Sequence, residues 1–148
     1  MADEVQIPIE SDADMVPARA EGRALALALG FSRTDATLIA TAISEVTRNI
    51  VMHVGCGEVL MKPVYEEKRR GIVVIARDQG AGIRDVEAAL GHGYTGRGGL
   101  GLGLPGARRL MDEFHIDTNS GSGTTVTMTK WRVRDELERL REKRRNVA

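Results

Sequence analysis

The sequence predicts a single α+β domain in which helices stack on a mixed, mostly antiparallel sheet. Two segments with apolar residues at helical spacing follow one short alternating strand near the N-terminus. Four later segments are short and rich in aliphatic or β-branched residues, and turns or a helix separate them. A chain of 148 residues is long enough to bury one core between two such layers.

The N-terminal third of the chain holds one strand and two helices. Apolar residues alternate over residues 5–9, which predicts a strand. A first helix is expected to start near Ser11, where two aspartates follow, and to end at Gly30. Ser32, with an acidic residue three positions later, predicts the start of a second helix over residues 33–53.

A hairpin follows the second helix. Residues 58–65 and 71–76 are strand candidates, and the second is a continuous aliphatic run that indicates a central strand. The charged residues 66–70 are expected to form the turn between them. Pro63 favours an edge position for the first of these strands, because proline cannot donate a ladder hydrogen bond. A short helix is predicted over residues 85–90.

The last part of the domain contains one helix and a second hairpin. We expect a helix over residues 104–112 and strands over 114–119 and 124–131. The chain is thus predicted to form one domain over residues 1–131. Residues 132–148 carry seven basic and four acidic side chains, which is typical of a solvated, charged helical tail.

Composition excludes several classes of function. Lys plus Arg and Asp plus Glu number 21 each, which argues against a general nucleic-acid-binding protein. The single cysteine, Cys56, excludes an internal disulfide and a cysteine-based zinc cluster. We find no apolar run of membrane-spanning length and no secretory signal pattern. A cytoplasmic protein without a membrane or nucleic-acid partner is therefore expected.

Glu45 and Asn49 lie four residues apart on the second predicted helix, so both side chains project from one helical face. An amide oxygen can ligate a hard cation such as Mg²⁺. A carboxylate can accept a proton from an attacking hydroxyl or hold a metal-bound water. The same spacing also fits the solvated polar face of an amphipathic helix, and the pair by itself leaves both interpretations open.

Asp78 follows the predicted central strand in the run DQGAGI. A carboxylate there can accept a hydrogen bond from an amino group such as adenine N6. Gly80 and Gly82 allow a sharp turn and leave room for a planar ring. Aspartate and glycine are equally typical of an ordinary strand-end turn. Thr124, at the start of the last predicted strand, adds a hydroxyl that would complete a base pocket.

Eight of the seventeen glycines fall within residues 91–106, directly before a predicted helix. Free N–H groups converge at a helix N-terminus and the dipole is positive there, so this segment predicts an anion site and favours phosphate. In RGGLGLGL, Leu100 and Leu102 would pack inward while the backbone N–H groups face phosphate. The glycine dihedrals also suit a lid that closes over a nucleotide. A flexible loop without a ligand is the alternative.

In this order the three motifs resemble the N box, G1 box and G2 box of the ATPase and kinase superfamily that includes gyrase and the histidine kinases. The resemblance covers roughly residues 11–131. It narrows with AISEVTRNIV, RDQGAGI and GYTGRGGLGLGLPGARRLMDEF, which are similar to the RsbT family of switch serine/threonine kinases in bacterial stressosome signalling. The anti-sigma kinases RsbW and SpoIIAB share the boxes but match less well around GLGLPGARRLMDEF.

The resemblance implies the Bergerat (GHKL) fold, with ATP and Mg²⁺ as cofactors. Asn49 matches the Mg²⁺-ligating position, Glu45 the general base, and Asp78 the residue that reads the adenine amino group. Arg97 departs from the family, where a small residue is expected, and it either reaches the terminal phosphate or points to solvent. The remaining nucleotide-binding positions come from the G1 box, the G2 box and the last strand: Gly80, Gly82, Gly99, Leu100, Gly101, Leu102, Gly103 and Thr124.

The resemblance also implies an activity. A kinase of this family phosphorylates a serine or threonine on a STAS-domain protein of the RsbS or RsbR type. Its release then switches on a downstream PP2C-type phosphatase or another output protein. One alternative is an anti-sigma factor that sequesters a sigma factor and phosphorylates its antagonist. Another is a nucleotide-binding scaffold without transfer activity. The GYTGRGGLGLGLPGARRLMDEF block favours the switch kinase over the anti-sigma factor.

Overall fold

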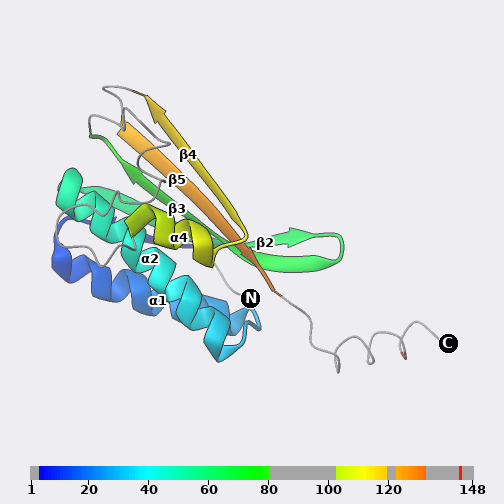
Figure 1. Cartoon of the computed structure of the whole chain (residues 1–148). Coiled ribbons are helices and arrows are strands. Elements are labelled where there is room, and N and C mark those ends of the chain that lie inside the picture. Colours follow the sequence, from blue (N-terminus) through cyan, green and yellow to red (C-terminus); the bar gives the residue numbers. More distant parts are fainter. Residues whose placement is uncertain (1–3, 81–102, 120–122, 133–143, 145–148) are drawn as a thin grey trace.

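The computed structural model describes residues 4–80, 103–119, 123–132 and 144, and places its helices in one layer over a five-stranded sheet (Figure 1). The expected α+β class is confirmed. The helical elements are η1 (Asp12–Asp14), α1 (Met15–Ala28), α2 (Arg33–His53) and α4 (Gly103–Leu110). The strands are β1 (Val5–Ile9), β2 (Gly57–Glu66), β3 (Arg69–Asp78), β4 (Glu113–Asn119) and β5 (Gly123–Trp131).

The strand order is β1-β2-β3-β5-β4. The prediction of a mixed sheet is wrong for the described strands, because all four of their pairings are antiparallel. The reason lies in the connection through α4. β4 runs in the same direction as β3, but its hairpin partner β5 inserts between the two strands. Each strand of the described sheet therefore has only antiparallel neighbours.

The boundaries of the two long helices follow from local chemistry. Asp14 accepts hydrogen bonds from the backbone N–H groups of Glu10 and Ser11 at 2.7 and 3.1 Å, and the α-helix begins one residue later. At its other end Gly30 adopts a φ of +93°, a conformation that glycine allows without a Cβ penalty. The predicted cap of α2 is confirmed, since Ser32 Oγ accepts from the Asp35 N–H at 3.0 Å.

The β2–β3 hairpin is longer than predicted. Glu66 pairs with Arg69 in the strand register, so only two residues form the turn. The edge position predicted from Pro63 is wrong for the strand, because β2 lies between β1 and β3. β2 is an internal strand where β1 pairs with it, and that pairing ends at Met61. Pro63 therefore lies where β2 has β3 as its described neighbour, and the missing N–H costs no ladder bond to β1.

The core is aliphatic, as an aromatic content of 3% requires. One face of α2 packs against alternate residues of the sheet, and the largest fully buried side chains come from these two layers. They include Ile39, Ile43, Val46, Val59, Met61, Ile72, Val74 and Met128. The polar residues of α2 then fall beside and opposite this apolar stripe.

The end of β5 is attached to the rest of the domain by side-chain contacts. The Arg69 guanidinium lies 3.8 Å from the centre of the Trp131 ring, and the Trp131 indole N–H donates to Glu113. Arg132 Nε donates to the Gly30 carbonyl at 2.9 Å. The tail predicted over residues 132–148 stays a prediction, because it lies outside the described residues except for Arg132 and Arg144. Among the helices described here, none has the length and apolar content that a membrane span requires.

Candidate functional site

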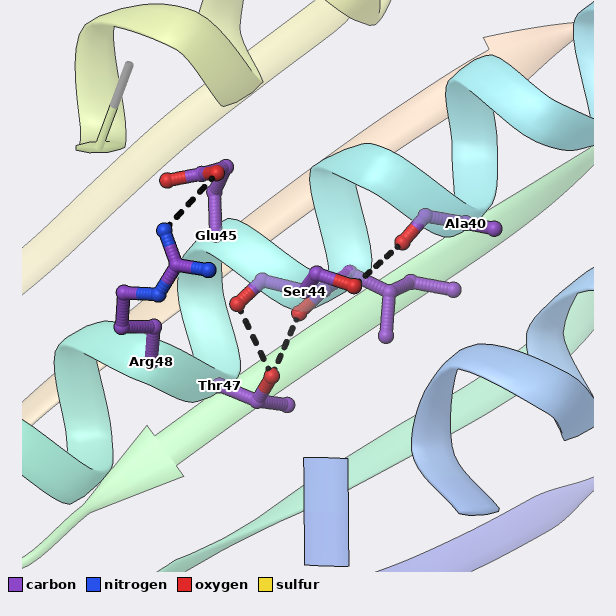
Figure 2. Close-up of polar contacts among 6 residues, drawn as sticks. Ala40, Ser44, Glu45, Thr47 and Arg48 are labelled. Atoms are coloured by element: carbon purple, nitrogen blue, oxygen red, sulfur yellow. Dashed lines mark hydrogen bonds and ion pairs between the residues drawn. The ribbon is translucent and has the colours of Figure 1, made fainter. Parts of the chain in front are cut away.

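Most hydroxyl side chains on α2 donate to carbonyls of their own helix, and Figure 2 shows this for Ser44 and Thr47. Thr47 Oγ1 lies 2.9 Å from the Ile43 carbonyl oxygen and 3.0 Å from that of Ser44, and Ser44 Oγ donates to Ala40 at 3.0 Å. Thr37 and Thr41 also donate to the carbonyl four residues earlier, which belongs to Arg33 and Thr37 respectively. These groups have satisfied their donors locally. Glu45 and Asn49 are the two candidate side chains of this stretch, and neither is bonded to a helix carbonyl among the described hydrogen bonds.

Glu45 carries a nearly buried carboxylate, with 5% of the side chain exposed. Its Oε1 lies 3.4 Å from Arg48 Nη1, and the Arg48 side chain is 43% exposed. Oε2 accepts no hydrogen bond from a described residue. One carboxylate oxygen is thus paired, and the other has no hydrogen-bond partner among the described residues.

A pocket of about 170 Å³ lies beside Glu45, between α2 and α4. Thr41 and Glu45 line it from α2, and Gly106, Arg109 and Leu110 line it from α4. Sites for drug-sized ligands usually measure some 300 to 1,000 Å³, so this pocket is too small to hold a whole nucleotide. It shows instead that α4, which contains the last residues of the glycine-rich segment, is packed next to the Glu45 side chain.

Asn49 lies one turn after Glu45 and is half-buried. No hydrogen bond of its side chain occurs within the described residues, so the carboxamide oxygen is available to a cation. The described residues contain no cluster of three or more His, Cys, Asp or Glu side chains that would hold a metal by themselves. One amide oxygen fits Mg²⁺, which usually keeps several waters and takes its other ligands from substrate phosphates.

Asp78 is the last residue of β3 and is 7% exposed. Its Oδ1 accepts from the Gly80 N–H at 2.9 Å, which orients the carboxylate. In the sheet it stands opposite Thr124 on one side and Gly57 on the other. Thr124 is also buried, and its hydroxyl oxygen lies 3.1 Å from that of Thr118. Two buried polar residues therefore occupy paired positions on the neighbouring strands β3 and β5.

The last turns of α2 pack on the strand end that carries Asp78. A Cβ atom built on Gly57 would lie 3.0 Å from Ile50 Cγ2, and one built on Gly80 would lie 2.8 Å from Val54 Cγ2. Figure 1 shows α2 and β3 ending at the same end of the molecule, where α4 and β5 begin. The structure thus brings the Asn49 end of α2 and the Asp78 end of β3 to one end of the domain.

Part of the predicted site lies outside the described residues. This applies to the predicted helix over residues 85–90 and to six candidate nucleotide-binding positions: Gly82, Arg97, Gly99, Leu100, Gly101 and Leu102. Gly103 is described, as the first residue of α4 with a φ of +44°. The lid predicted over the glycine-rich segment therefore stays a prediction.

Two residues that sequence reasoning missed stand next to the predicted ones. Thr118 contacts Thr124, and Arg48 contacts Glu45. The i to i+3 spacing of Glu45 and Arg48 on a helix is a signal that was present in the sequence. The Thr118–Thr124 contact required the hairpin register, in which these two residues pair directly.

Gly123→Ala is expected to destabilise the domain by about 3 kcal/mol. An alanine there would be strained in its backbone conformation, and its Cβ would also collide with a neighbouring backbone atom. Gly123 has a φ of +93°, and its Cβ would lie 2.1 Å from the Asp78 carbonyl oxygen. Gly55→Ala is the matched control. Gly55 has a φ of +102° with open space around a Cβ, so strain alone should cost about 1 kcal/mol. Equal midpoint shifts of the two variants in denaturant unfolding would contradict the close approach.

Comparison with known proteins decides the family. The family model for the histidine kinase-like ATPase domain matches residues 9–130 of the chain. The chain belongs to this family. It is 42% identical over 131 residues to the serine/threonine-protein kinase RsbT of Bacillus subtilis strain 168, a match that covers 88% of the chain and 98% of RsbT. This similarity places the chain among the RsbT-type kinases.

The anti-sigma proteins are more distant relatives of this RsbT-type chain. The anti-sigma F factor of Clostridium novyi is 32% identical over 117 residues, covering 72% of the chain and 81% of that protein. The serine-protein kinase RsbW of Bacillus licheniformis is 32% identical over 126 residues, and the match covers 77% of the chain and 76% of RsbW.

A solved structure confirms the fold of the histidine kinase-like ATPase family. The RsbU and RsbW domains of a Mycobacterium tuberculosis protein align with a TM-score of 0.55 and 24% identity. The alignment covers 87% of the chain and 33% of that structure. With the family membership, the chain is an ATP-using serine/threonine-protein kinase of the RsbT type.

Proposed function

We propose that the chain transfers the terminal phosphoryl group of MgATP to a serine or threonine of a STAS-domain partner of the RsbS or RsbR type. Release of the modified partner then frees the kinase to switch on a PP2C-type phosphatase or another output protein. The observation that carries the proposal is that Glu45 Oε2 and, one turn away, the Asn49 amide both lack a hydrogen bond to a described residue. The 42% identity to RsbT supports the type of partner.

The nucleotide is proposed to lie with its base against the end of β3. Oδ1 of Asp78 is already bonded to Gly80, so Oδ2 is the atom that would accept a hydrogen bond from the adenine amino group. The Thr124 hydroxyl borders the same position in the neighbouring strand. From there the phosphates would extend toward Asn49 and Glu45, which α2 carries on one face.

The Asn49 carboxamide oxygen is the group that would hold Mg²⁺. Bound there, the ion would supply positive charge that offsets the negative charge developing in phosphoryl transfer. The acceptor oxygen forms the new bond to the γ-phosphorus while the bond from that phosphorus to the β–γ bridging oxygen breaks. The electron pair leaves with ADP. The acceptor proton passes to Oε2 of Glu45, the carboxylate oxygen that Arg48 does not contact.

The proposal is tested by incubating the chain with radiolabelled ATP, Mg²⁺ and a STAS-domain protein encoded in the same genome. Label is expected on a serine or threonine of the STAS protein. A parallel pull-down offers STAS proteins and sigma factors as prey. Retention of a sigma factor, with no label on any STAS protein, would instead support the anti-sigma alternative.

Asn49→Ala is expected to weaken MgATP binding at least tenfold while leaving the fold intact, because a half-buried polar residue without hydrogen bonds to the described residues contributes little to packing. Equilibrium titration with a fluorescent ATP analogue measures the affinity. His53→Ala, one turn further along α2 at an exposed position, is the matched control and should leave it unchanged. An unchanged affinity of Asn49→Ala would contradict the metal role.

A further inference from the structure

We propose that Arg48 is a positioning residue that holds the Glu45 carboxylate in the orientation needed to accept the proton from the acceptor hydroxyl. The inference rests on the proposed function, since it concerns the same transfer step. Arg48 is not among the candidate residues of the three sequence motifs, and its part in the site follows from one contact. Arg48 Nη1 lies 3.4 Å from Glu45 Oε1 (Figure 2).

The burial of the two partners is unequal, and this asymmetry separates the contact from an ordinary surface ion pair. Glu45 is 5% exposed and Arg48 43% exposed. Exposed pairs contribute little to stability because both ions are well solvated apart. A nearly buried carboxylate has lost most of its water, so its remaining charged partner matters more. Within the described residues, Arg48 is the side chain that Glu45 pairs with.

The contact also makes the two carboxylate oxygens different from each other. Oε1 is held by the guanidinium, and Oε2 accepts no hydrogen bond from the described residues. The neighbouring hydroxyls of Ser44 and Thr47 cannot take over this task, because they donate to helix carbonyls. Without Arg48 the carboxylate is free to rotate between rotamers, and Oε2 is no longer presented in one direction.

This role predicts an effect on the chemical step and not on nucleotide binding. A misplacement of a reacting group by about 1 Å can cost roughly a hundredfold in rate. Arg48→Ala is therefore expected to lower kcat for transfer to a STAS-domain acceptor at least tenfold. The KM for MgATP should stay within about twofold of wild type. Arg48→Lys keeps a cation three residues after Glu45 and should recover part of the loss.

Arg77→Ala is the matched control. Arg77 Nη1 lies 3.7 Å from Glu58 Oε1, and the Arg77 side chain is 47% exposed. The N···O distance and the exposure of the arginine are therefore similar to those of the Arg48–Glu45 pair. It connects β2 and β3 and has no contact with Glu45. We expect kcat of this variant to stay within about twofold of wild type. A kcat of Arg48→Ala equally close to wild type would overturn the proposal.

A double-mutant cycle separates action through Glu45 from any direct action of Arg48. In a Glu45→Gln background, Arg48→Ala should produce no further fall in transfer, measured in single turnovers with radiolabelled ATP. A fall by the same factor as in wild type would show that Arg48 acts independently of Glu45. Absence of transfer by the wild type itself would contradict the proposed function. This result differs from the one that would contradict the role of Arg48 alone.

Stability offers a readout that does not depend on activity. The wild type, both single variants and the double variant are compared in denaturant unfolding. If the two side chains are paired in solution, the midpoint shifts of Glu45→Gln and Arg48→Ala should be non-additive, because each removes the same contact. Additive shifts would show that the contact is absent, and the positioning role would fail with it.

Discussion

Asp78→Asn should weaken ATP binding by about a hundredfold while leaving the fold intact. Asn has the same shape as Asp, and its amide oxygen can keep the 2.9 Å hydrogen bond from the Gly80 N–H. The amide NH₂ then replaces Oδ2. Two donors, this NH₂ and the adenine amino group, would face each other at a nearly buried position. The loss combines a charge-assisted hydrogen bond with two donors left unsatisfied.

Inosine triphosphate makes this experiment selective. Its base carries a carbonyl oxygen in place of the adenine amino group. The new amide NH₂ of the Asp78→Asn variant would donate to this oxygen, whereas the wild-type carboxylate would repel it. The variant should therefore bind ATP more weakly than the wild type does. Its affinity for inosine triphosphate should fall only slightly or increase. Calorimetric titration of both nucleotides measures the two affinities, and equal losses would indicate a disturbed fold and contradict the recognition role.

Glu45→Gln is expected to lower kcat for transfer by a factor of about 10² to 10⁴, which is the range for loss of a general base. Gln keeps the size of the side chain but cannot accept the proton as a carboxylate does. Arg48 loses a charged partner, yet at 43% exposure water can solvate its guanidinium, so the cost in stability should be small. Radiolabel transfer to a STAS-domain acceptor measures the rate.

The affinity for MgATP provides the control for this second substitution. Glu45 is not proposed to touch the nucleotide base or to ligate the metal, so Glu45→Gln should bind the fluorescent ATP analogue within about twofold of wild type. Ser44→Ala, at the adjacent position of α2, loses a hydroxyl that bonds only to a helix carbonyl among the described residues, and it should retain transfer. Transfer by Glu45→Gln at the wild-type rate would remove Glu45 from the mechanism.

Features that depend on a few adjacent residues were predictable from the sequence. The cap at Ser32 and the helix end at Gly30 were predicted correctly, because each rests on a hydrogen bond or a dihedral within one turn. The central position of β3 followed from its continuous aliphatic run. The length of the charged turn was not predictable, because pairing of Glu66 with Arg69 competes with the turn tendency of charged residues.

Features that depend on distant segments required the tertiary structure. The antiparallel neighbours of β3 and β5 result from the insertion of β5 beside β3, and no local pattern encodes that choice. Sequence spacing placed Glu45 and Asn49 on one helical face, but it could not show that Glu45 would be nearly buried. Nor could it show which of the two carboxylate oxygens is held by Arg48.

The sequence by itself determined the helices that the structure describes, most strand positions and the identity of the candidate residues, because helix capping, periodicity and glycine spacing act over short stretches of chain. The tertiary structure alone decided that the Asn49 end of α2 packs on the strand end of Asp78, and that Thr124 faces Asp78 across the sheet. These contacts join residues far apart in the chain. Their formation depends on how the apolar faces of α2 and the sheet pack together, which is a property of the whole core.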